Sequence, residues 1–356
     1  MNSLKTYYSL GIMSGTSLDG LDLAYCVFNY VNNNWSYDLL NSRTIVYPKE
    51  IIALLKEAYT CPGRRLTEID ALYGRFIGET VKQFIKEHKI TPNLIASHGH
   101  TIFHEPEKGF TLQIGNGAQI ASVTGIETVC NFRQLDVALD GQGAPLVPIG
   151  DKFLFGDYDV CLNLGGFSNV SFDKDGKRIA FDICAVNFVI NALVKPLGLE
   201  MDKDGKLAEK GKVKHDLLER LNNIELYRNE TKKSLGQEWV ESTIFPILEE
   251  YPNLTKTDLV CTYTEHAAVQ IVKVLNQIDG TRVLLTGGGT FNKYLVGRIT
   301  ANTNKTIMIP DEETVKFKEA LIFAFLGVLN ICNVENTLSS VTGAKKDSIG
   351  GVKFKI

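Results

Sequence analysis

The sequence predicts an α/β protein of two related lobes, each built around a mixed β-sheet, and three stretches of the chain support this prediction. A strand, a small polar loop and a second strand occupy residues 10–25. The same pattern returns at 159–173, about one domain length further along, which indicates an internal duplication. The third stretch, 282–292, runs from an apolar strand into three successive glycines and a helix start, which suits nucleotide binding.

Length and composition limit the classes of function. The 356 residues suffice for two domains with a cleft between them. Hydrophobic residues make up 44% and charged residues 22%, as in a soluble globular protein. A formal net charge of −3 indicates no basic surface, so nucleic acid and anionic membranes are not expected as partners. Seven scattered cysteines without a C-x-x-C pair predict reduced thiols and a cytoplasmic location, and no signal peptide or membrane span is expected.

The first loop is a candidate phosphate site. Small and hydroxyl-bearing residues crowd 11–20 between apolar flanks, and their N–H groups and hydroxyls can surround phosphate oxygens. Asp19 and Asp22 could act on a metal-bound phosphate or on a substrate proton. An ordinary β-hairpin with a polar turn is the alternative, because such turns are common.

Regular elements follow this loop. An extended run is predicted at 35–47, after an Asn-rich turn. Apolar residues at helical spacing predict a helix over 66–88, with Thr67 as its N-cap and Asp70 three residues on. A short apolar strand then leads into a loop with three histidines.

These histidines, His98, His100 and His104, invite a metal hypothesis. No cysteine or clustered carboxylate completes such a site, and strand alternation places only His98 and His100 together on one face. A loop that faces a sugar or another substrate is favoured, because imidazole can donate to and accept from hydroxyl groups.

The stretch 111–121 predicts a strand, an Asn-Gly turn and a helix start, and 129–151 is irregular. Long irregular segments in compact proteins are usually functional, so this one is expected to form the cleft floor and the crossing between lobes. Arg133, Asp136 and Asp140 lie there in a Gly-rich loop. Ligand contact is favoured over a merely charged surface.

The second half repeats the opening and adds helices. Gly165, Gly166, Ser168 and Asn169 form the second small polar loop. A strand over 178–187 is expected to place Asp182 at its carboxyl end, where ligand sites concentrate in α/β sheets. Further predictions are helices over 186–197, 258–277 and 314–331, strands over 282–286, 306–310 and 352–356, and a polar segment of loops and short helices over 200–235. The helix at 258–277 contains His266, which is expected to be a buried supporting histidine.

The three glycine-containing loops occur in the order of the phosphate 1, phosphate 2 and adenosine motifs of the actin, sugar-kinase and heat-shock ATPase superfamily. Within it the chain resembles the anhydro-N-acetylmuramic acid kinase family. The resemblance rests on segments from end to end: MSGTSLDGLD (13–22), SHGHTIFHEP (97–106), TLQIG (111–115), GQGAPLVP (141–148), LNLGGFSNVS (162–171), FD (181–182), TGGGTFN (286–292) and SVTGA (340–344). It implies a two-lobed actin-like ATPase (ribonuclease H-like) fold with an ATP cleft between duplicated lobes. The lobes would be 1–134 with 338–356, and 135–337.

The resemblance also implies an ATP- and Mg²⁺-dependent enzyme. It would hydrolyse the anhydro bond of 1,6-anhydro-N-acetylmuramic acid and phosphorylate the freed O6, giving N-acetylmuramic acid 6-phosphate in cell-wall recycling. Asp182 would be the base that activates water. Contacts to ATP would come from Gly15, Thr16, Ser17, Leu18, Asp19, Gly20, Leu21, Asp22, Gly165, Gly166, Gly287, Gly288, Gly289 and Asn292. Contacts to the sugar would come from His98, His104, Arg133, Gln142 and Asn187. Metal ligands are not assigned, and a homodimer is left open.

The chain departs from the family pattern at four places near the expected cleft. The family typically has DTGPGN where Asp182 is here followed by ICAVN, and GDFR where this chain has CNFR with Asn131. It also has HGQT where His100 replaces the glutamine, and IGD where Asn116 replaces the aspartate. Two alternatives therefore stay open: a related kinase for another sugar, and a nucleotide-binding protein without turnover.

Overall fold

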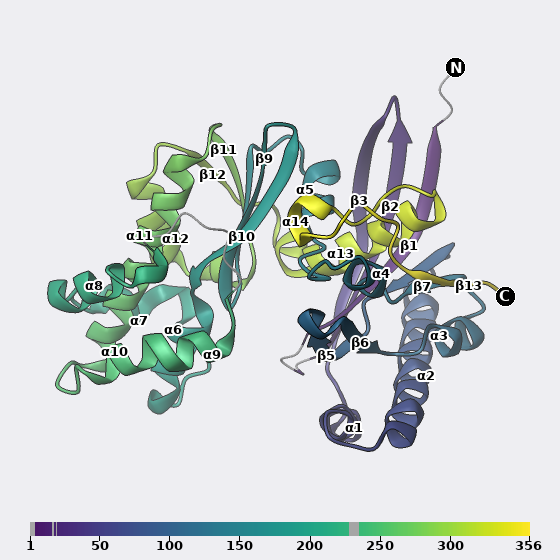
Figure 1. Cartoon of the computed structure of the whole chain (residues 1–356), viewed down its shortest axis with the longest axis horizontal. Coiled ribbons are helices and arrows are strands. Elements are labelled where there is room, and N and C mark those ends of the chain that lie inside the picture. The colour runs from purple at the N-terminus through teal and green to yellow at the C-terminus, as the bar shows by residue number, and fades with distance from the viewer. Residues whose placement is uncertain (1–3, 16–17, 19, 228–234) are drawn as a thin grey trace. The chain divides into compact units, whose positions relative to one another are not determined.

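The computed structural model describes residues 4–15, 18, 20–227 and 235–356 (Figure 1). These form two compact units: unit 1 comprises 1–154 and 317–356, and unit 2 comprises 155–316. Each unit contains a mixed sheet, which confirms the predicted α/β class. The sequence prediction placed the lobe boundaries at 134/135 and 337/338. In the structure the second boundary falls inside helix α13 (Glu312–Ile331).

The sheet of unit 1 has six strands in the order β13-β7-β4-β1-β2-β3. β1 and β2 form an antiparallel hairpin, β3 continues it, and β4 and β7 run parallel to β1 on the other side. β5 and β6 form a separate two-stranded hairpin. The strands are β1 (Lys5–Ser14), β2 (Leu21–Val31), β3 (Asn34–Ile45), β4 (Leu94–Ser97), β5 (His100–Glu105), β6 (Phe110–Ile114), β7 (Thr128–Cys130) and β13 (Val352–Phe354).

The sheet of unit 2 repeats this arrangement with five strands in the order β10-β9-β8-β11-β12. Again an antiparallel hairpin, β8–β9, carries a third antiparallel strand on one side and two parallel strands on the other. The strands are β8 (Val160–Leu164), β9 (Phe167–Lys174), β10 (Lys177–Ala185), β11 (Arg282–Thr286) and β12 (Thr306–Met308). The shared strand order confirms the predicted duplication.

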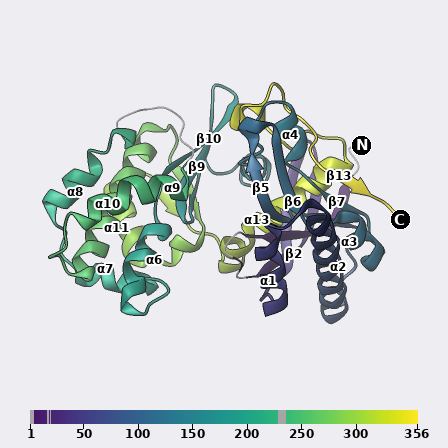
Figure 2. The same cartoon turned by 60° about the horizontal axis from the view of Figure 1, so that its bottom comes forward.

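Helices cover the sheet of unit 1, and α2 and α3 lie side by side in both views (Figures 1 and 2). The helices are α1 (Lys49–Ala58), α2 (Gly63–His88), α3 (Gly117–Thr124), α4 (Gln134–Ala138), α5 (Pro148–Leu154), most of α13, and α14 (Ser339–Thr342). Most of the face of α2 that sequence periodicity predicted is buried in the core, through Ile69, Tyr73, Ile77, Val81 and Phe84, whereas Leu72 is exposed.

Helix α13 approaches the sheet closely because β1 has a glycine there. A Cβ at Gly11 would lie 1.8 Å from the carbonyl oxygen of Ala320, so no other residue fits without moving the backbone. Burial of a nearly all-apolar stretch of α13, from Ala320 to Leu329, stabilises this contact by the hydrophobic effect.

The start of α2 differs from the prediction. Pro62, in an extended conformation, precedes the helix, which begins at Gly63. Thr67 lies inside the helix and its hydroxyl donates to the carbonyl of Gly63, so the predicted Thr67 N-cap is wrong.

Two other parts of the chain also differ from the sequence prediction. Helix α1 and the helices at 237–249 were not predicted. The segment 129–151 is more regular than expected, because it contains β7, α4 and α5.

The helices of unit 2 are α6 (Asn187–Val194), α7 (Lys206–Lys210), α8 (His215–Asn222), α9 (Gln237–Trp239), α10 (Phe245–Glu249), α11 (Lys256–Gln277) and α12 (Lys293–Asn302). The buried helix α11 is N-capped by Thr255, whose hydroxyl accepts from the N–H of Asp258. On α11, His266 is fully buried and its Nδ1 lies 2.7 Å from Oδ1 of Asn222. The predicted burial of His266 is confirmed. None of the helices in the described residues has the length and apolar character needed to cross a membrane.

Candidate functional site

In unit 1 the first polar loop is the turn between β1 and β2. Ser14 pairs with Leu21 as the last rung of the hairpin, so the chain reverses between these two residues. Thr16, Ser17 and Asp19, three of the predicted ATP contacts, lie outside the described residues. Leu18 has a φ of 58°, the left-handed region that a bulky residue rarely adopts.

The other predicted members of this stretch lie around the turn. Gly15 accepts a long hydrogen bond from the N–H of Leu18, and Gly20 is buried. The Leu21 side chain is fully buried in the core of unit 1, so any contact between Leu21 and ATP would come from its backbone. Asp22 accepts a 2.5 Å hydrogen bond from the Thr44 hydroxyl on β3.

In unit 2 the second polar loop is the tight turn between β8 and β9, and it holds the start of α6. The carbonyl of Gly166 accepts from the N–H of Val186 at 2.8 Å, and that of Gly165 accepts from the N–H of Asn187 at 3.3 Å. The Asn187 side chain donates to the carbonyl of Leu164. The structure therefore brings three predicted residues, Gly165, Gly166 and Asn187, into direct contact.

The three glycines after β11 pack against this same turn. Gly287 has a φ of 86°, and a Cβ there would lie 2.8 Å from the carbonyl carbon of Leu164. A Cβ at Gly289 would lie 2.7 Å from the Leu164 Cβ. At Gly288, in contrast, a Cβ would meet no protein atom within 4 Å. Gly287 and Gly289 thus fit the two loops together, and Gly288 leaves open space beside them.

Asn292, predicted to contact ATP, has a clear structural role. Its side-chain oxygen accepts from the N–H of Leu295 at 3.0 Å and caps α12. A cap of this kind contributes about 1 kcal/mol to stability. Any contact with a nucleotide would be additional to this cap.

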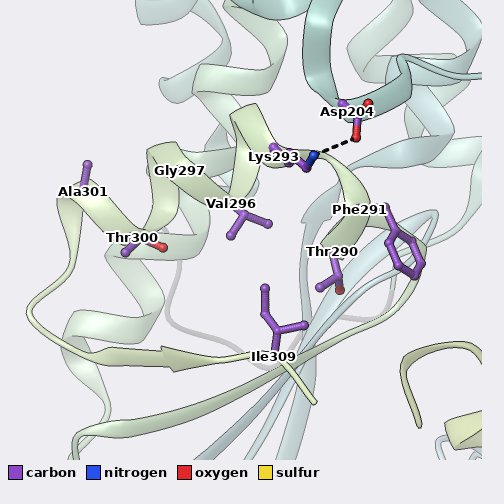
Figure 3. Close-up of a pocket in the computed structure, with 9 residues that line it drawn as sticks. All are labelled: Asp204, Thr290, Phe291, Lys293, Val296, Gly297, Thr300, Ala301 and Ile309. Atoms are coloured by element: carbon purple, nitrogen blue, oxygen red, sulfur yellow. Dashed lines mark ion pairs between the residues drawn. The ribbon is translucent and has the colours of Figure 1, made fainter. Parts of the chain in front are cut away.

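A pocket of about 600 Å³ lies next to these glycines, within unit 2 (Figure 3). It is lined by Asp204, Thr290, Phe291, Lys293, Val296, Gly297, Thr300, Ala301 and Ile309. Figure 3 shows Val296, Thr290 and Ile309 turned toward one another, with Phe291 beside them. Asp204 and Lys293 form a 3.5 Å ion pair at its edge. A Cβ at Gly297 would meet nothing within 4 Å, so a flat ring could lie against α12. The largely apolar lining beside a glycine loop fits a nucleobase.

A row of polar residues crosses the sheet of unit 2 at the level of the turn. Strand register pairs Thr286 with Asn163, Asn163 with Asn169, and Asn169 with Asp182. Directly paired residues project from the same face of a sheet, so these four side chains share one face. The sequence analysis did not single out Asn163, because cross-strand pairing becomes visible only once register is known.

Asp182 lies in β10 as the sixth of its nine residues, not at the carboxyl end that the sequence predicted. The pairing with β9 shifts immediately afterwards, between Asp182 and Cys184, so a β-bulge redirects the strand there. Oδ2 of Asp182 accepts from the N–H of Leu235 at 2.8 Å. Burial raises the pKa of the Asp182 carboxyl, and the Leu235 hydrogen bond opposes this rise.

A simpler role for Asp182, as the N-cap of the helix that follows it, does not hold. The N-cap residue of α6 is Val186, and no side chain caps that helix. The partly buried Asp182 carboxylate therefore does not serve as a helix cap.

In unit 1, Arg133, His98, His104 and Gln142 gather near one another. Arg133 donates from Nε to Nε2 of His98 at 2.9 Å and from Nη1 to the carbonyl of Gly143 at 2.6 Å. Burial lowers the pKa of Arg133 to about 10, so Arg133 stays charged at neutral pH. Burial and, next, the Arg133 charge hold the pKa of His98 well below its usual range. This cluster offers one cation for an acidic ligand group.

His104 joins this cluster from β5. Its Nδ1 lies 3.0 Å from the Thr111 hydroxyl. Burial and then the Arg133 charge lower the pKa of His104, while a hydrogen bond with the backbone of Gln142 raises it. The N–H of Gln142 donates to the carbonyl of Thr342, which fixes this loop against the C-terminal segment.

Asp136 does not take part in ligand contact as the sequence suggested. Its two carboxylate oxygens accept from the N–H of Gly143 and from the Thr342 hydroxyl, each at 2.7 Å. The side chain is fully buried and ties the loop to the C-terminal segment. Asp140 is exposed and pairs with Lys345.

The sequence analysis predicted that His98 and His100 lie on the same face of one strand. This prediction is wrong, because the two residues do not belong to one strand. Gly99, between them, has a φ of 77° and separates β4 from β5. His98 consequently meets Arg133, whereas His100 meets Ser14 and Tyr59. Among the described residues there is no group of three or more His, Cys, Asp or Glu side chains arranged to hold a metal.

At three of the four places where the chain departs from the family pattern, the residues present contact defined structural partners. Asn116 caps α3 through its side-chain oxygen and donates to Asp70. Cys184 and Ala185 are fully buried, and the Ala185 carbonyl accepts from the Tyr263 hydroxyl. His100 joins the side-chain network of unit 1. Asn131 has a φ of 59°, a left-handed conformation that asparagine tolerates.

Comparisons with known proteins agree with this arrangement. The family model described as anhydro-N-acetylmuramic acid kinase matches residues 7–355. An anhydro-N-acetylmuramic acid kinase of Pasteurella multocida is 34% identical, over 98% of this chain and 97% of its own length. One from Pseudomonas paraeruginosa is 35% identical, over 97% of this chain and 98% of its own length.

Solved structures give more distant likenesses. Plasmodium falciparum glycerol kinase with ADP has 11% identity and a TM-score of 0.42, over 91% of this chain and 90% of its own. The Clostridium difficile activator of 2-hydroxyisocaproyl-CoA dehydratase with bound ADPNP has 15% identity and a TM-score of 0.42, over 90% of this chain and 94% of its own. The matches along the whole sequence decide the assignment: the chain belongs to the anhydro-N-acetylmuramic acid kinase family.

Proposed function

We propose that this chain is an ATP- and Mg²⁺-dependent kinase that opens 1,6-anhydro-N-acetylmuramic acid with water and phosphorylates O6, giving N-acetylmuramic acid 6-phosphate. Full-length family membership sets the reaction class. The structural observation that carries the proposal is the contact in unit 2 between the β8–β9 turn and the glycines after β11, beside an apolar pocket.

The nucleotide half of the reaction is assigned to this part of unit 2. The pocket at Phe291, Val296 and Ile309 accommodates the base, and Gly288 leaves room for the sugar of the nucleotide. In unit 2, backbone N–H groups at Gly165 and Gly166 are assigned to the phosphates. In unit 1, the same role is assigned to Gly15. ATP supplies the phosphoryl group, and Mg²⁺ neutralises its charge during transfer.

The hydrolytic half is assigned to Asp182. O6 of the anhydro sugar is bonded to C1, so that bond must break before O6 can accept phosphate. Asp182 takes a proton from the water that attacks C1, and the C1–O6 bond breaks with its electron pair left on O6. O6 then forms its bond to the γ-phosphorus and ADP leaves. A raised pKa at Asp182 makes it a stronger base toward water.

In unit 1, sugar binding is assigned to Arg133, His98, His104 and Gln142. In unit 2, the predicted sugar contact is Asn187. Arg133 is the group suited to the sugar's carboxylate, because a guanidinium binds carboxylates with two parallel hydrogen bonds. A cytoplasmic location is part of the proposal and is supported by the seven cysteines, all of which lie in the described residues and none of which is in a disulfide. A homodimer remains a prediction that a mass measurement in solution would test.

An ATP-coupled assay across a panel of anhydro and reducing amino sugars tests the proposal. We expect turnover of the anhydro sugar only. In ¹⁸O water the label should enter C1 of the product and not its phosphate. Phosphorylation of reducing sugars alone, or label in the phosphate, would refute the hydrolytic mechanism.

A related kinase for another sugar is the second candidate. The departures from the family pattern favour it, although Asn116, Cys184 and Ala185 are accounted for by caps and core contacts. The same sugar panel separates the two candidates, because a different sugar would give the highest kcat/KM. Binding of nucleotide with no turnover of any sugar would indicate a nucleotide-binding protein without turnover.

A further inference from the structure

Five side chains of unit 1 form one continuous hydrogen-bonded chain that reaches the β1–β2 turn. The hydroxyls of Tyr73 and Tyr47 lie 2.7 Å apart, and Tyr47 lies 2.8 Å from the Ser14 hydroxyl. Ser14 lies 2.9 Å from Nδ1 of His100, whose Nε2 lies 3.3 Å from the Tyr59 hydroxyl. The chain thus links α2 and the first residue of β5 to the last residue of β1.

With a neutral His100 ring, only one arrangement of protons satisfies every link of this chain. Tyr59 donates to the carbonyl of Thr101, which can only accept, so the Tyr59 oxygen must accept from Nε2–H of His100. Nδ1 of His100 is then an acceptor, and Ser14 donates to it. Tyr47 in turn donates to Ser14, and Tyr73 donates to Tyr47. A neutral His100 imidazole therefore carries its proton on Nε2.

Burial makes this arrangement hard to change. Ser14, Tyr47, Tyr73 and His100 are at most 4% exposed. A buried polar group that loses its partner costs about 1–3 kcal/mol, so each side chain fixes its neighbours. Burial also lowers the pKa of His100 to about 4, which agrees with a neutral ring throughout the physiological range.

The turn that this network reaches has an unfavourable backbone conformation of its own. Leu18 adopts a φ of 58° without being glycine, which costs roughly 1 kcal/mol and needs support from outside the turn. Ser14 immediately precedes the turn and is the residue through which His100 acts on it.

We propose that His100 is a positioning residue: by accepting from Ser14 and donating to Tyr59, it fixes Ser14 at the end of β1 and so the adjoining Gly15. This inference rests on the proposed function, which assigns Gly15 to the phosphates of ATP. Phosphoryl transfer depends mainly on positioning, so a misplaced turn should affect turnover more than binding.

The test compares His100→Leu with His100→Gln. Leucine fills similar space without hydrogen bonds, whereas the glutamine amide can both accept from Ser14 and donate to Tyr59. We expect His100→Leu to lower kcat about tenfold or more, with KM for ATP and for the sugar changed less than about threefold. His100→Gln should recover kcat to within about threefold of the wild type.

His266→Leu and His266→Gln are the matched controls, since His266 is also a buried neutral histidine but lies in the core of unit 2. They should change the melting temperature and leave kcat unchanged. In ¹⁵N spectra, His100 should be the Nε2–H tautomer and should not titrate between about pH 5 and 8.

The inference is overturned if His100→Leu keeps kcat within twofold, if His100→Gln is as impaired as His100→Leu, or if His100 is the Nδ1–H tautomer. A wild-type protein without ATP-dependent phosphorylation would instead refute the proposed function. The two failures are therefore distinguishable.

Discussion

Arg133 donates from Nε to Nε2 of His98 across 2.9 Å, so the imidazole must keep that nitrogen unprotonated. The other ring nitrogen, Nδ1, donates to the carbonyl of Gly99. His98 thus holds the guanidinium from one side, and the Gly143 carbonyl holds it from another. The direction of the Arg133 side chain depends on both.

Removing the imidazole should therefore weaken sugar binding. We expect His98→Ala to raise KM for the sugar about tenfold or more, because a charge-assisted hydrogen bond is worth about 1.5–3 kcal/mol. KM for ATP should change little. Steady-state kinetics in both substrates measures this effect.

The surface pair of Arg43 and His88 provides the control, because Arg43 likewise contacts Nε2 of its histidine, at 3.0 Å. His88→Ala should leave both KM values unchanged. An equal rise in the two KM values for His98→Ala would point to a general loss of structure and contradict the prediction.

Gly288 gives a sharp test of the nucleotide site. A Cβ there meets no protein atom, so Gly288→Val should fold normally and encounter only a bound ligand. We expect KM for ATP to rise about tenfold or more, since even one misfitting methyl group costs 1–3 kcal/mol in a specific pocket. The sugar dissociation constant should stay nearly unchanged, as calorimetry would show.

Gly63→Val is the matched control, because a Cβ at Gly63 also meets nothing within 4 Å but lies at the start of α2 in unit 1. An unaltered ATP affinity in Gly288→Val would mean that the adenosine site lies elsewhere. Gly289→Val is unsuitable as a test, because Leu164 would have to move.

Asp182→Asn should lower turnover about a hundredfold or more, which is the usual scale of general-base catalysis. The amide oxygen of the introduced asparagine can still accept from the N–H of Leu235. The melting temperature and the affinity for ATP should therefore be preserved. Single-turnover kinetics and thermal unfolding measure the two quantities.

Asp258→Asn is the comparison, because Asp258 also accepts a backbone N–H, from Lys212, in unit 2. It should leave turnover intact. If Asp182→Asn lost stability and kept its turnover per folded molecule, Asp182 would be a structural residue.

Acid should destabilise the protein partly through His266. Burial lowers the pKa of His266 to about 3, whereas an unfolded histidine titrates near 6.5. Between these pH values the unfolded state binds more protons, so stability falls as pH falls through this window. The loss should amount to about 2 kcal/mol at pH 5 from this residue.

Urea unfolding at pH 7 and pH 5 checks this, with His266→Gln as the comparison. Glutamine can donate to Asn222 as His266 does, but it does not titrate. The variant should lose less stability than the wild type between the two pH values. Equal losses would show that His266 does not contribute.

The sequence predicted the elements whose signal is local. The helical spacing of Ile69, Tyr73 and Ile77 identified α2, and the small polar loops identified both hairpin turns. The start of α2 was wrong because Thr67, a good capping residue, lies one turn inside a helix that Pro62 begins.

Features that depend on the three-dimensional arrangement could not be predicted. The polar row from Thr286 to Asp182 exists only through strand register. Asp136 looked like a ligand contact because its partner Thr342 is distant in sequence. The different surroundings of His98 and His100 depend on the backbone conformation of Gly99. Each feature that the sequence did not predict depends on a partner distant in sequence or on a backbone dihedral angle.

The hydrogen bond between Asp136 and Thr342 joins residues 206 positions apart. Unit 1 is thus assembled from both ends of the chain, while unit 2 is one continuous segment, 155–316. A ribosome releases the whole of unit 2 before residues 317–356, which supply most of α13 and strand β13 to unit 1. We expect unit 2 to acquire its structure during synthesis, and unit 1 to remain open until translation is nearly finished. During that interval the sheet edge at β7, later covered by β13, is exposed to chaperones and to other nascent chains.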